Sequence, residues 1–198
     1  MKFTMSDLLA DAKNELRRDA VAQRDALPVG VRAAAAEAIA ARPFPLSFAP
    51  GTVVSGFMPL KNEIDPLPLM RALARHGARL ALPVVIGRGK PLLMREWAFG
   101  EPLASGNWGI REPTPQAAAV DPEILIVPLL AYDRTGNRIG YGAGYYDLTI
   151  AQLRARKPII AAGLAFAAQE VPAVPVSARD ARLDLVLTER EVIDLRGQ

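Results

Sequence analysis

The sequence predicts an α/β protein with three layers, helix–sheet–helix, around a mostly parallel central sheet. Short runs of apolar and β-branched residues alternate with helical patterns along the chain, as they do in folds built from β-α-β units. The composition, 51% hydrophobic and 23% charged over 198 residues, is that of a globular protein that buries a core. We expect residues 1–198 to form a single domain.

The first third of the chain predicts two helices and then a strand. Apolar residues between 8 and 27 fall on one stripe, so we expect a long amphipathic helix that is capped by Ser6 and ended by Pro28. An alanine-rich helix follows over 31–41. Residues 52–58 are rich in β-formers and are bounded by glycine and proline, which is typical of a buried strand.

The rest of the chain continues the alternation. Asp65-Pro66 opens a helix, because proline is tolerated in the first helical turn. The clearest strand is 123–128, whose apolar run is too short for a helix. The remaining elements are strands at 79–86, 92–97, 158–163 and 185–188, a long loop at 100–116, and helices at 65–77 and 144–156.

Composition excludes several kinds of site. The chain has no cysteine, which excludes disulfides, zinc-thiolate and iron–sulfur sites and thiol nucleophiles. The net charge of +3 is too mild to indicate nucleic acid but suits local anion binding. Residues 1–16 carry charges within their apolar stretch, unlike a signal peptide, and no run reaches the ~18 apolar residues of a membrane span. We expect a cytoplasmic protein with no membrane or nucleic-acid partner.

The single histidine, His76, precedes Gly77 at the end of a predicted helix. A histidine there complements the negative end of the helix dipole. Its position argues against histidine acid–base chemistry or a Ser-His-Asp triad.

The most informative segment has four glycines, at 136, 140, 142 and 144, between the clearest strand and a helix. Glycines let backbone N–H groups approach a ligand, and a helix N-terminus favours anions, so the junction predicts a phosphate site. Arg134 and Arg138 could add charge around it. Neither GxxxxGK[ST] nor GxGxxG is present, so a flexible surface loop with tight turns explains the glycines equally well.

Carboxylates and tyrosines bracket the glycines and shift the balance towards a site. Asp133 precedes them and Asp147 follows, and carboxylates beside phosphates are what Mg²⁺ requires. A first-turn acid that complements the helix dipole also explains Asp147. Tyr145 and Tyr146 could line a ligand or could pack into the core.

Together these residues form the pattern Pro128-x-x-x-x-Asp133-x-x-Gly136-x-Arg138-Ile139-Gly140-x-Gly142-x-Gly144-Tyr145-Tyr146-Asp147. This pattern resembles the signature of 5-formyltetrahydrofolate cyclo-ligases, also called 5,10-methenyltetrahydrofolate synthetases. The match fixes about a dozen positions, and the resemblance covers essentially the whole chain. It implies a fold related to those of sugar-phosphate isomerases and coenzyme A transferases.

The resemblance also implies a reaction. The formyl oxygen on N5 attacks the γ-phosphate of Mg-ATP to give an imino phosphate, and N10 then closes the ring as phosphate leaves. The expected partners are ATP as co-substrate and 5-formyltetrahydrofolate, with Mg²⁺ as cofactor and a monomeric protein. This chemistry asks for positioning and charge stabilisation, which suits a chain without a cysteine or a catalytic histidine.

The resemblance extends to the first predicted helix. Lys13 and Arg17 lie four residues apart on one face, with Arg24 seven further along, and a solvated helix face explains that spacing as well as an anion site does. Lys13-Asn-Glu-Leu16-Arg17 resembles the family's Lys-x-x-Leu-Arg stretch, which implies contact with ATP phosphate. The implied ATP site comprises Lys13, Arg17, Arg138, Ile139, Gly140, Tyr141, Gly142, Ala143, Gly144, Tyr145 and Tyr146, of which Lys13 and Arg138 are also catalytic.

The implied folate site comprises Glu63, Trp108, Tyr145 and Tyr146. Glu63 follows a predicted strand and resembles the family's folate-contacting acid, although helix capping also explains it and is our interpretation of Asp65. Trp108 could stack on the pteridine while Arg111 reaches a carboxylate, or it could pin the long loop to the core. Asp147 and Asp180 are the implied Mg²⁺ ligands.

Two residues depart from the family pattern. Tyr141 stands where many members have arginine or lysine, and Arg179 stands where histidine or asparagine is usual. They favour an alternative, a paralogue that keeps the fold and the nucleotide loop but uses another substrate or has a non-catalytic binding role. A nucleic-acid-binding module that uses the arginine-rich first helix is a further alternative, which predicts steeply salt-dependent binding.

Overall fold

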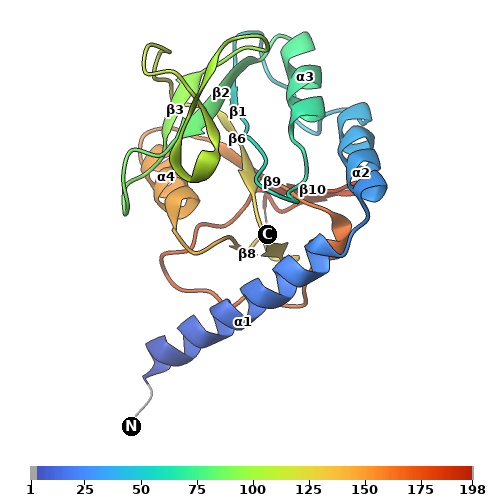
Figure 1. The fold of residues 1–198 in the computed structure, drawn as a ribbon, viewed down its shortest axis with the longest axis vertical. Helices are drawn as coiled ribbons and strands as arrows, with labels where there is room; N and C mark the ends of the chain where they lie inside the picture. Colours follow the sequence, from blue (N-terminus) through green and yellow to red (C-terminus); the bar gives the residue numbers. More distant parts are fainter. Residues whose placement is uncertain (1–3, 198) are drawn as a thin grey trace.

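The computed structural model describes residues 4–197, and its centre is a seven-stranded sheet (Figure 1). The strands lie in the order β11 (Val192–Asp194), β10 (Leu185–Leu187), β9 (Ile160–Leu164), β6 (Ile124–Pro128), β1 (Val53–Ser55), β2 (Arg79–Val84) and β3 (Leu93–Glu96). The five inner strands are mutually parallel, and the two edge strands pair antiparallel with their neighbours. This confirms the mostly parallel sheet.

Helices cover both faces of the sheet, as the alternation of buried residues requires. The helices are α1 (Met5–Asp25), α2 (Val29–Ala41), α3 (Leu67–Arg75) and α4 (Tyr145–Arg154), with short 3-10 turns at η1 (Asn107–Gly109) and η2 (Ala167–Gln169). Val54 and Ile126 belong to the core that contains α2 and α3, whereas Leu125 and Val127 belong to the core that contains α4. Successive strand residues point to opposite faces, so the three-layer prediction is confirmed.

Helix α1 lies across the lower side of the molecule in Figure 1, past the hairpin that contains β8. Its stripe of Leu16, Ala20 and Val21 packs against Leu130 and Ile139. None of the helices within residues 4–197 combines the length and apolar content that crossing a membrane requires.

The cap of α1 differs from the prediction. The side chain of Thr4, not Ser6, accepts the backbone N–H of Asp7 at 3.1 Å, and the Asp7 carboxylate accepts the N–H of Thr4 at 2.9 Å. Of the two neighbouring hydroxyl residues, Thr4 is the one with an acid three residues later, which completes a capping box.

The structure adds five short strands that the sequence did not predict, four of them in two hairpins. The loop expected at 100–116 contains the hairpin β4 (Leu103–Ser105) and β5 (Arg111–Pro113), and the glycine-rich segment contains the hairpin β7 (Ala131–Tyr132) and β8 (Arg138–Ile139). The edge strand β11 is the fifth. Strands of two or three residues are too short to show a period. The other expected elements are present, with ends shifted by at most a few residues.

The order of the strands singles out one edge of the sheet. From β1 the chain moves outward to β2 and β3, and it then returns to β6 on the other side of β1 before continuing to β9 and β10. In open α/β sheets, ligands bind beyond the carboxyl ends of the strands at such a reversal. The segments that follow β1 and β6 at this edge are 56–65 and 129–147.

Candidate active site

The glycine-rich segment consists of two parts, and the first is a rigid turn. Asp133 is buried and accepts the backbone N–H groups of Thr135 at 2.9 Å, Asn137 at 3.1 Å and Val174 at 3.0 Å. Burial alone would raise the pKa of Asp133, but these hydrogen bonds outweigh it and hold the pKa below the usual 3.8. Both carboxylate oxygens are used by these groups and by the Asn137 side chain, so Asp133 holds its own turn together and the structure gives no support for it as a Mg²⁺ ligand.

The second part, residues 140–144, leads into α4. Gly142 has φ +100° and Gly144 has φ +71°, backbone conformations that L side chains rarely adopt. Gly144 is the N-cap of α4 and provides no side-chain hydrogen bond to the helix, so the first N–H groups of the helix remain available to an anion. Such a geometry suits a phosphate group, and residues 140–144 are hereafter called the cradle.

Helix α1 brings two cations to segments that lie far away in the sequence. Arg17 Nε donates to the carbonyl oxygen of Gly140 at 2.9 Å. Lys13 Nζ contacts Asp180 Oδ2 in a partly buried ion pair. The structure therefore brings the predicted Arg17 to residues 140–144 at the uncapped end of α4, and it brings Lys13, one turn earlier on α1, to Asp180.

The two predicted metal ligands lie on adjacent segments. Asp147 Oδ1 accepts from Arg138 Nη1 at 2.8 Å and from the backbone N–H of Ala181, the residue after Asp180, at 3.0 Å. Burial raises the pKa of Asp180, but hydrogen bonds from Lys13 and Ser177 outweigh it and hold the pKa below 3.8. The Asp180 carboxylate is therefore ionised at neutral pH, as a metal ligand must be.

Among the residues that the structure describes, no three His, Cys, Asp or Glu side chains gather as a metal cluster. Mg²⁺ in phosphate sites typically uses one or two carboxylates and takes its other ligands from substrate phosphates and water. Asp147 and Asp180 beside the cradle fit such an ion.

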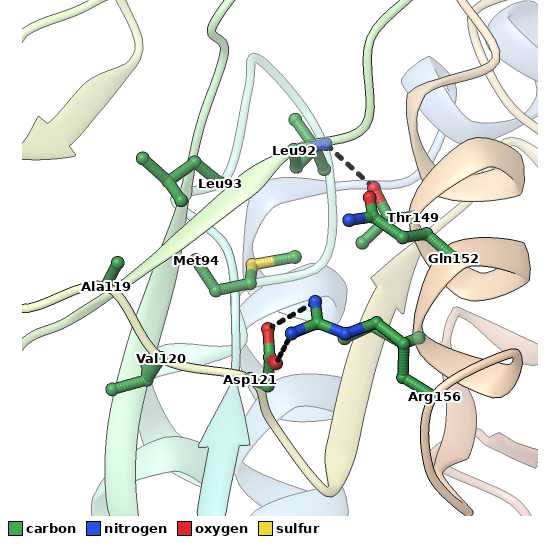
Figure 2. Close-up of a pocket in the computed structure, with 10 residues that line it drawn as sticks. Leu92, Leu93, Met94, Ala119, Val120, Asp121, Thr149, Gln152 and Arg156 are labelled. Atoms are coloured by element: carbon green, nitrogen blue, oxygen red, sulfur yellow. Dashed lines mark hydrogen bonds and ion pairs between the residues drawn. The ribbon is translucent and has the colours of Figure 1, made fainter.

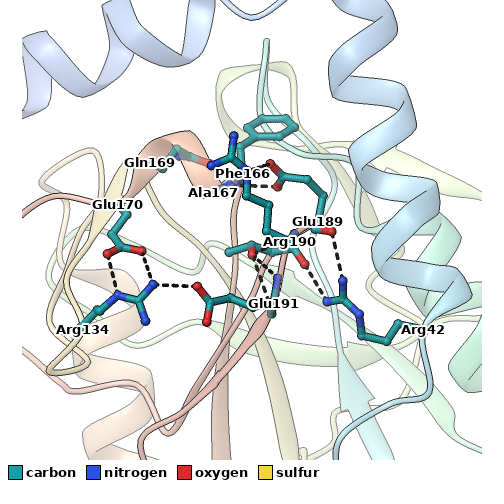
Figure 3. Close-up of polar contacts among 10 residues, drawn as sticks. Arg42, Arg134, Phe166, Ala167, Gln169, Glu170, Glu189, Arg190 and Glu191 are labelled. Carbon is teal, nitrogen blue, oxygen red and sulfur yellow. Dashed lines mark hydrogen bonds and ion pairs between the residues drawn. The ribbon is translucent and has the colours of Figure 1, made fainter.

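Arg134 does not reach the glycines. Its Nε lies 2.7 Å from Glu170 Oε1, and its Nη2 lies 2.6 Å from Glu191 Oε1 (Figure 3). The two glutamates hold its charge, so the prediction that Arg134 adds charge around the glycines is wrong.

The predicted folate residues meet at the same edge. Trp108 has φ +55° and is 66% exposed, and its ring centroid lies 6.1 Å from that of Tyr145. Holding a large apolar side chain in this unusual conformation and in solvent contributes nothing to a core, so the observation favours a ligand-stacking role over the pinning of a loop.

Glu63 and Tyr146, two of the predicted folate residues, are partly buried. The Glu63 carboxylate accepts the backbone N–H of Leu60 at 2.7 Å, and burial raises its pKa above 4.5 against the opposing effects of that N–H and of the Arg24 charge. The Tyr146 hydroxyl is buried without a hydrogen-bond partner among residues 4–197. Burial, assisted by the Glu63 charge, raises the pKa of Tyr146 well above its usual value. A buried hydroxyl without a partner costs stability unless a ligand satisfies it.

Comparison with known proteins shows the family of the chain. The model of the 5-formyltetrahydrofolate cyclo-ligase family matches residues 10–189. The chain belongs to this family. It is 31% identical over 194 residues to the 5-formyltetrahydrofolate cyclo-ligase of Mycolicibacterium smegmatis, which covers 93% of this chain and 98% of the relative.

Two further cyclo-ligase relatives support the assignment. The chain is 33% identical over 147 residues to the enzyme of Escherichia coli, covering 70% of this chain and 79% of the relative. The NMR structure of Aquifex aeolicus 5,10-methenyltetrahydrofolate synthetase superposes with a TM-score of 0.77 at 28% identity and covers 94% of both chains. The fold and the family of ligases are thereby shown.

One further residue of this cyclo-ligase chain, to which the sequence assigned no role, contacts the candidate site. Arg24, in the last turn of α1, is 1% exposed, and its Nη1 donates to the hydroxyl of Tyr141 at 2.9 Å. Its spacing of seven from Arg17 placed it on the same helix face, which was the available signal.

A cavity of about 310 Å³ lies elsewhere, between β3 and α4 (Figure 2). Leu92 and Met94 line one wall, and Thr149 and Arg156 line the other, with Arg156 paired to Asp121 at 2.8 Å. None of the predicted site residues lines this cavity. The candidate site is instead built from loops at the carboxyl edge of the sheet.

Proposed function

We propose that this chain catalyses the ATP-dependent cyclisation of 5-formyltetrahydrofolate to 5,10-methenyltetrahydrofolate, with ADP and phosphate as the other products. The observation that carries the proposal is the convergence at one edge of the sheet of an uncapped helix N-terminus, two cations from α1 and the exposed Trp108 beside Tyr145. One half suits a nucleotide, and the other suits a flat aromatic substrate.

The nucleotide half binds the phosphates of ATP. The N–H groups of residues 142–146 and the guanidinium of Arg17 face the β- and γ-phosphates, and Lys13 exchanges its partner Asp180 for a phosphate oxygen. Mg²⁺ held by Asp147 and Asp180 supplies charge neutralisation at the phosphates when it is bound. The buried Arg138 keeps Asp147 in place.

The folate half holds the pterin. Trp108 and Tyr145 present aromatic faces, Glu63 accepts hydrogen bonds from pterin N–H groups, and the Tyr146 hydroxyl gains a partner. In this arrangement the formyl oxygen on N5 attacks the γ-phosphorus and ADP departs. N10 then attacks the activated formyl carbon, the C–O bond to phosphate breaks, and the proton of N10 leaves with the phosphate as hydrogen phosphate. The protein contributes orientation and exclusion of water, and no side chain needs to act as a general base.

The test is a coupled measurement of both products. Purified protein with Mg-ATP and 5-formyltetrahydrofolate should release ADP and develop methenyl absorbance in the near ultraviolet, in equal amounts, and only when both substrates are present. ADP release that does not depend on folate would favour the paralogue with another substrate. No methenyl product at micromolar enzyme would refute the proposal.

A further inference from the structure

Arg24 is a buried cation whose partners do not account for its burial. Besides the bond to Tyr141, the only hydrogen bonds of its side chain within residues 4–197 run from Nε and Nη2 to Asp25 Oδ1, both at 3.4 Å. The Asp25 side chain is itself 38% exposed. A guanidinium has five N–H donors, and burying it with one hydrogen bond of ordinary length is costly. Buried charges with weak structural partners concentrate at functional sites.

Arg24 contacts the nucleotide half of the site, and its charge acts on a residue of the folate half. On the nucleotide side it donates to the Tyr141 hydroxyl, and its Cζ lies 5.8 Å from the centroid of the Tyr141 ring. On the folate side its charge lowers the pKa of Glu63 against the effect of burial. Burial is the largest cause that raises the pKa of Tyr141 and of Tyr146, and the Glu63 charge also raises both. These side chains therefore share one electrostatic neighbourhood.

The loop that Arg24 contacts has few other restraints from side chains. Tyr141 is 48% exposed, and the neighbouring Gly142 and Ala143 are also exposed. The remaining bond from α1 to this loop is that of Arg17 to the Gly140 carbonyl. ATP that orders residues 140–144 would therefore fix Tyr141, and through it the position of the Arg24 guanidinium relative to Glu63.

We propose that Arg24 is a positioning residue that couples the two substrate sites, so that nucleotide in the glycine loop strengthens the binding of 5-formyltetrahydrofolate at Glu63, and the reverse. The proposal rests on the proposed function. The coupling is a free energy shared between two sites, so it must be reciprocal. Arg24 acts through Tyr141 and Glu63 and needs no contact with the reacting atoms.

The experiment measures binding, not turnover. The dissociation constant of 5-formyltetrahydrofolate is determined by calorimetry with and without a non-hydrolysable ATP analogue and Mg²⁺, and the ratio of the two constants is the coupling factor. The variants are Arg24→Gln, Arg24→Lys and Tyr141→Phe. Arg18→Gln is the matched control, because Arg18 is an exposed arginine on the same helix.

We expect the wild-type protein to bind folate more tightly with the analogue present. Losing a charge-assisted hydrogen bond should reduce the coupling factor by about tenfold in Arg24→Gln and Tyr141→Phe. Arg24→Lys should keep part of it, because the charge remains, and Arg18→Gln should leave it unchanged. A residue that only stabilised the fold would weaken both ligands without changing the ratio.

The inference would be overturned if Tyr141→Phe and Arg24→Gln kept the coupling factor of the wild type. It would also be overturned if the wild type bound both ligands without coupling. Either result would leave the proposed function standing. If the wild type bound neither ligand, that result would refute both the inference and the proposed function. If Arg24→Gln does not fold, Tyr141→Phe decides alone, since it deletes one hydroxyl from a half-exposed side chain.

Discussion

Arg138 offers the sharpest test of how the site is built, because its charge can be structural or can act directly on ATP. Its side chain is 5% exposed, and its Nη1 donates to Asp147 Oδ1 at 2.8 Å and to the Ala181 carbonyl at 3.1 Å. We predict that its main contribution is to hold Asp147 at the start of α4. Arg138→Met removes the charge and keeps much of the side-chain length.

The expected loss follows from the burial of the pair. Deleting one partner of a fully buried ion pair costs about 3–5 kcal/mol. The Asp147 side chain is 23% exposed and keeps the N–H of Ala181, so we expect about 2–4 kcal/mol in this case. For a chain of this length that loss lowers the Tm by roughly 5–15 °C.

Urea and thermal unfolding measure this loss, and Arg134→Met is the control. Arg134 lies four residues earlier on the same hairpin and pairs with two glutamates, but its side chain is 56% exposed, so its loss should be far smaller. The double variant Arg138→Met/Asp147→Leu should recover part of the stability, because it no longer leaves an unpaired carboxylate. Equal losses for Arg138→Met and Arg134→Met would refute the argument from burial.

Three further substitutions separate folding from binding. Glu63→Gln should weaken folate binding yet stabilise the fold. Because the pKa of Glu63 is raised in the folded state, the wild-type protein loses stability as the pH rises through that pKa. In urea unfolding, the gain in stability of the variant should therefore be absent at about pH 4 and present at about pH 8. Trp108→Ala should leave the Tm nearly unchanged and raise the KM for folate about tenfold. In the control Trp97→Ala, where the side chain is 5% exposed, the free energy of unfolding should fall by about 3–5 kcal/mol. The opposite pattern would contradict a stacking role for Trp108. Gly142→Ala places a Cβ 3.2 Å from the Arg17 guanidinium carbon at φ +100°, so it should cost about 1–2 kcal/mol and weaken binding of an ATP analogue in calorimetry; unchanged affinity would count against the cradle.

The layers of the fold could be predicted from the sequence because the signals are local. Strands such as 123–128 are short apolar runs, helix ends carry proline and glycine, and their alternation implies a parallel sheet. The hairpins β4–β5 and β7–β8 could not be predicted, because strands of two or three residues are too short to show the alternation of apolar and polar residues. The prediction of Ser6 as the N-cap of α1 was wrong because the cap depends on the acid three residues later, which Thr4 has and Ser6 lacks.

The glycine loop and its flanking acids could be located from spacing, but their partners could not. Arg17 bonds to Gly140 across 123 residues, and Lys13 pairs with Asp180 across 167. Only the docking of α1 against the β7–β8 hairpin creates these contacts. The same limit applies to Asp133, whose residue type suits a metal but whose oxygens are used within its own turn and by Val174.

Arg24 shows how such a residue can be found from sequence. Leu16, Ala20 and Arg24 are spaced by four, so all three lie on one stripe of the first helix, and the first two are apolar. The stripe that packs against the core predicts burial at position 24, and an arginine there breaks the binary pattern. A buried charge that breaks a local rule needs a compensating gain, and such positions are most often functional. Tyr141, 117 residues away, is the partner that the pattern could not name, and its hydroxyl is where that gain can be measured.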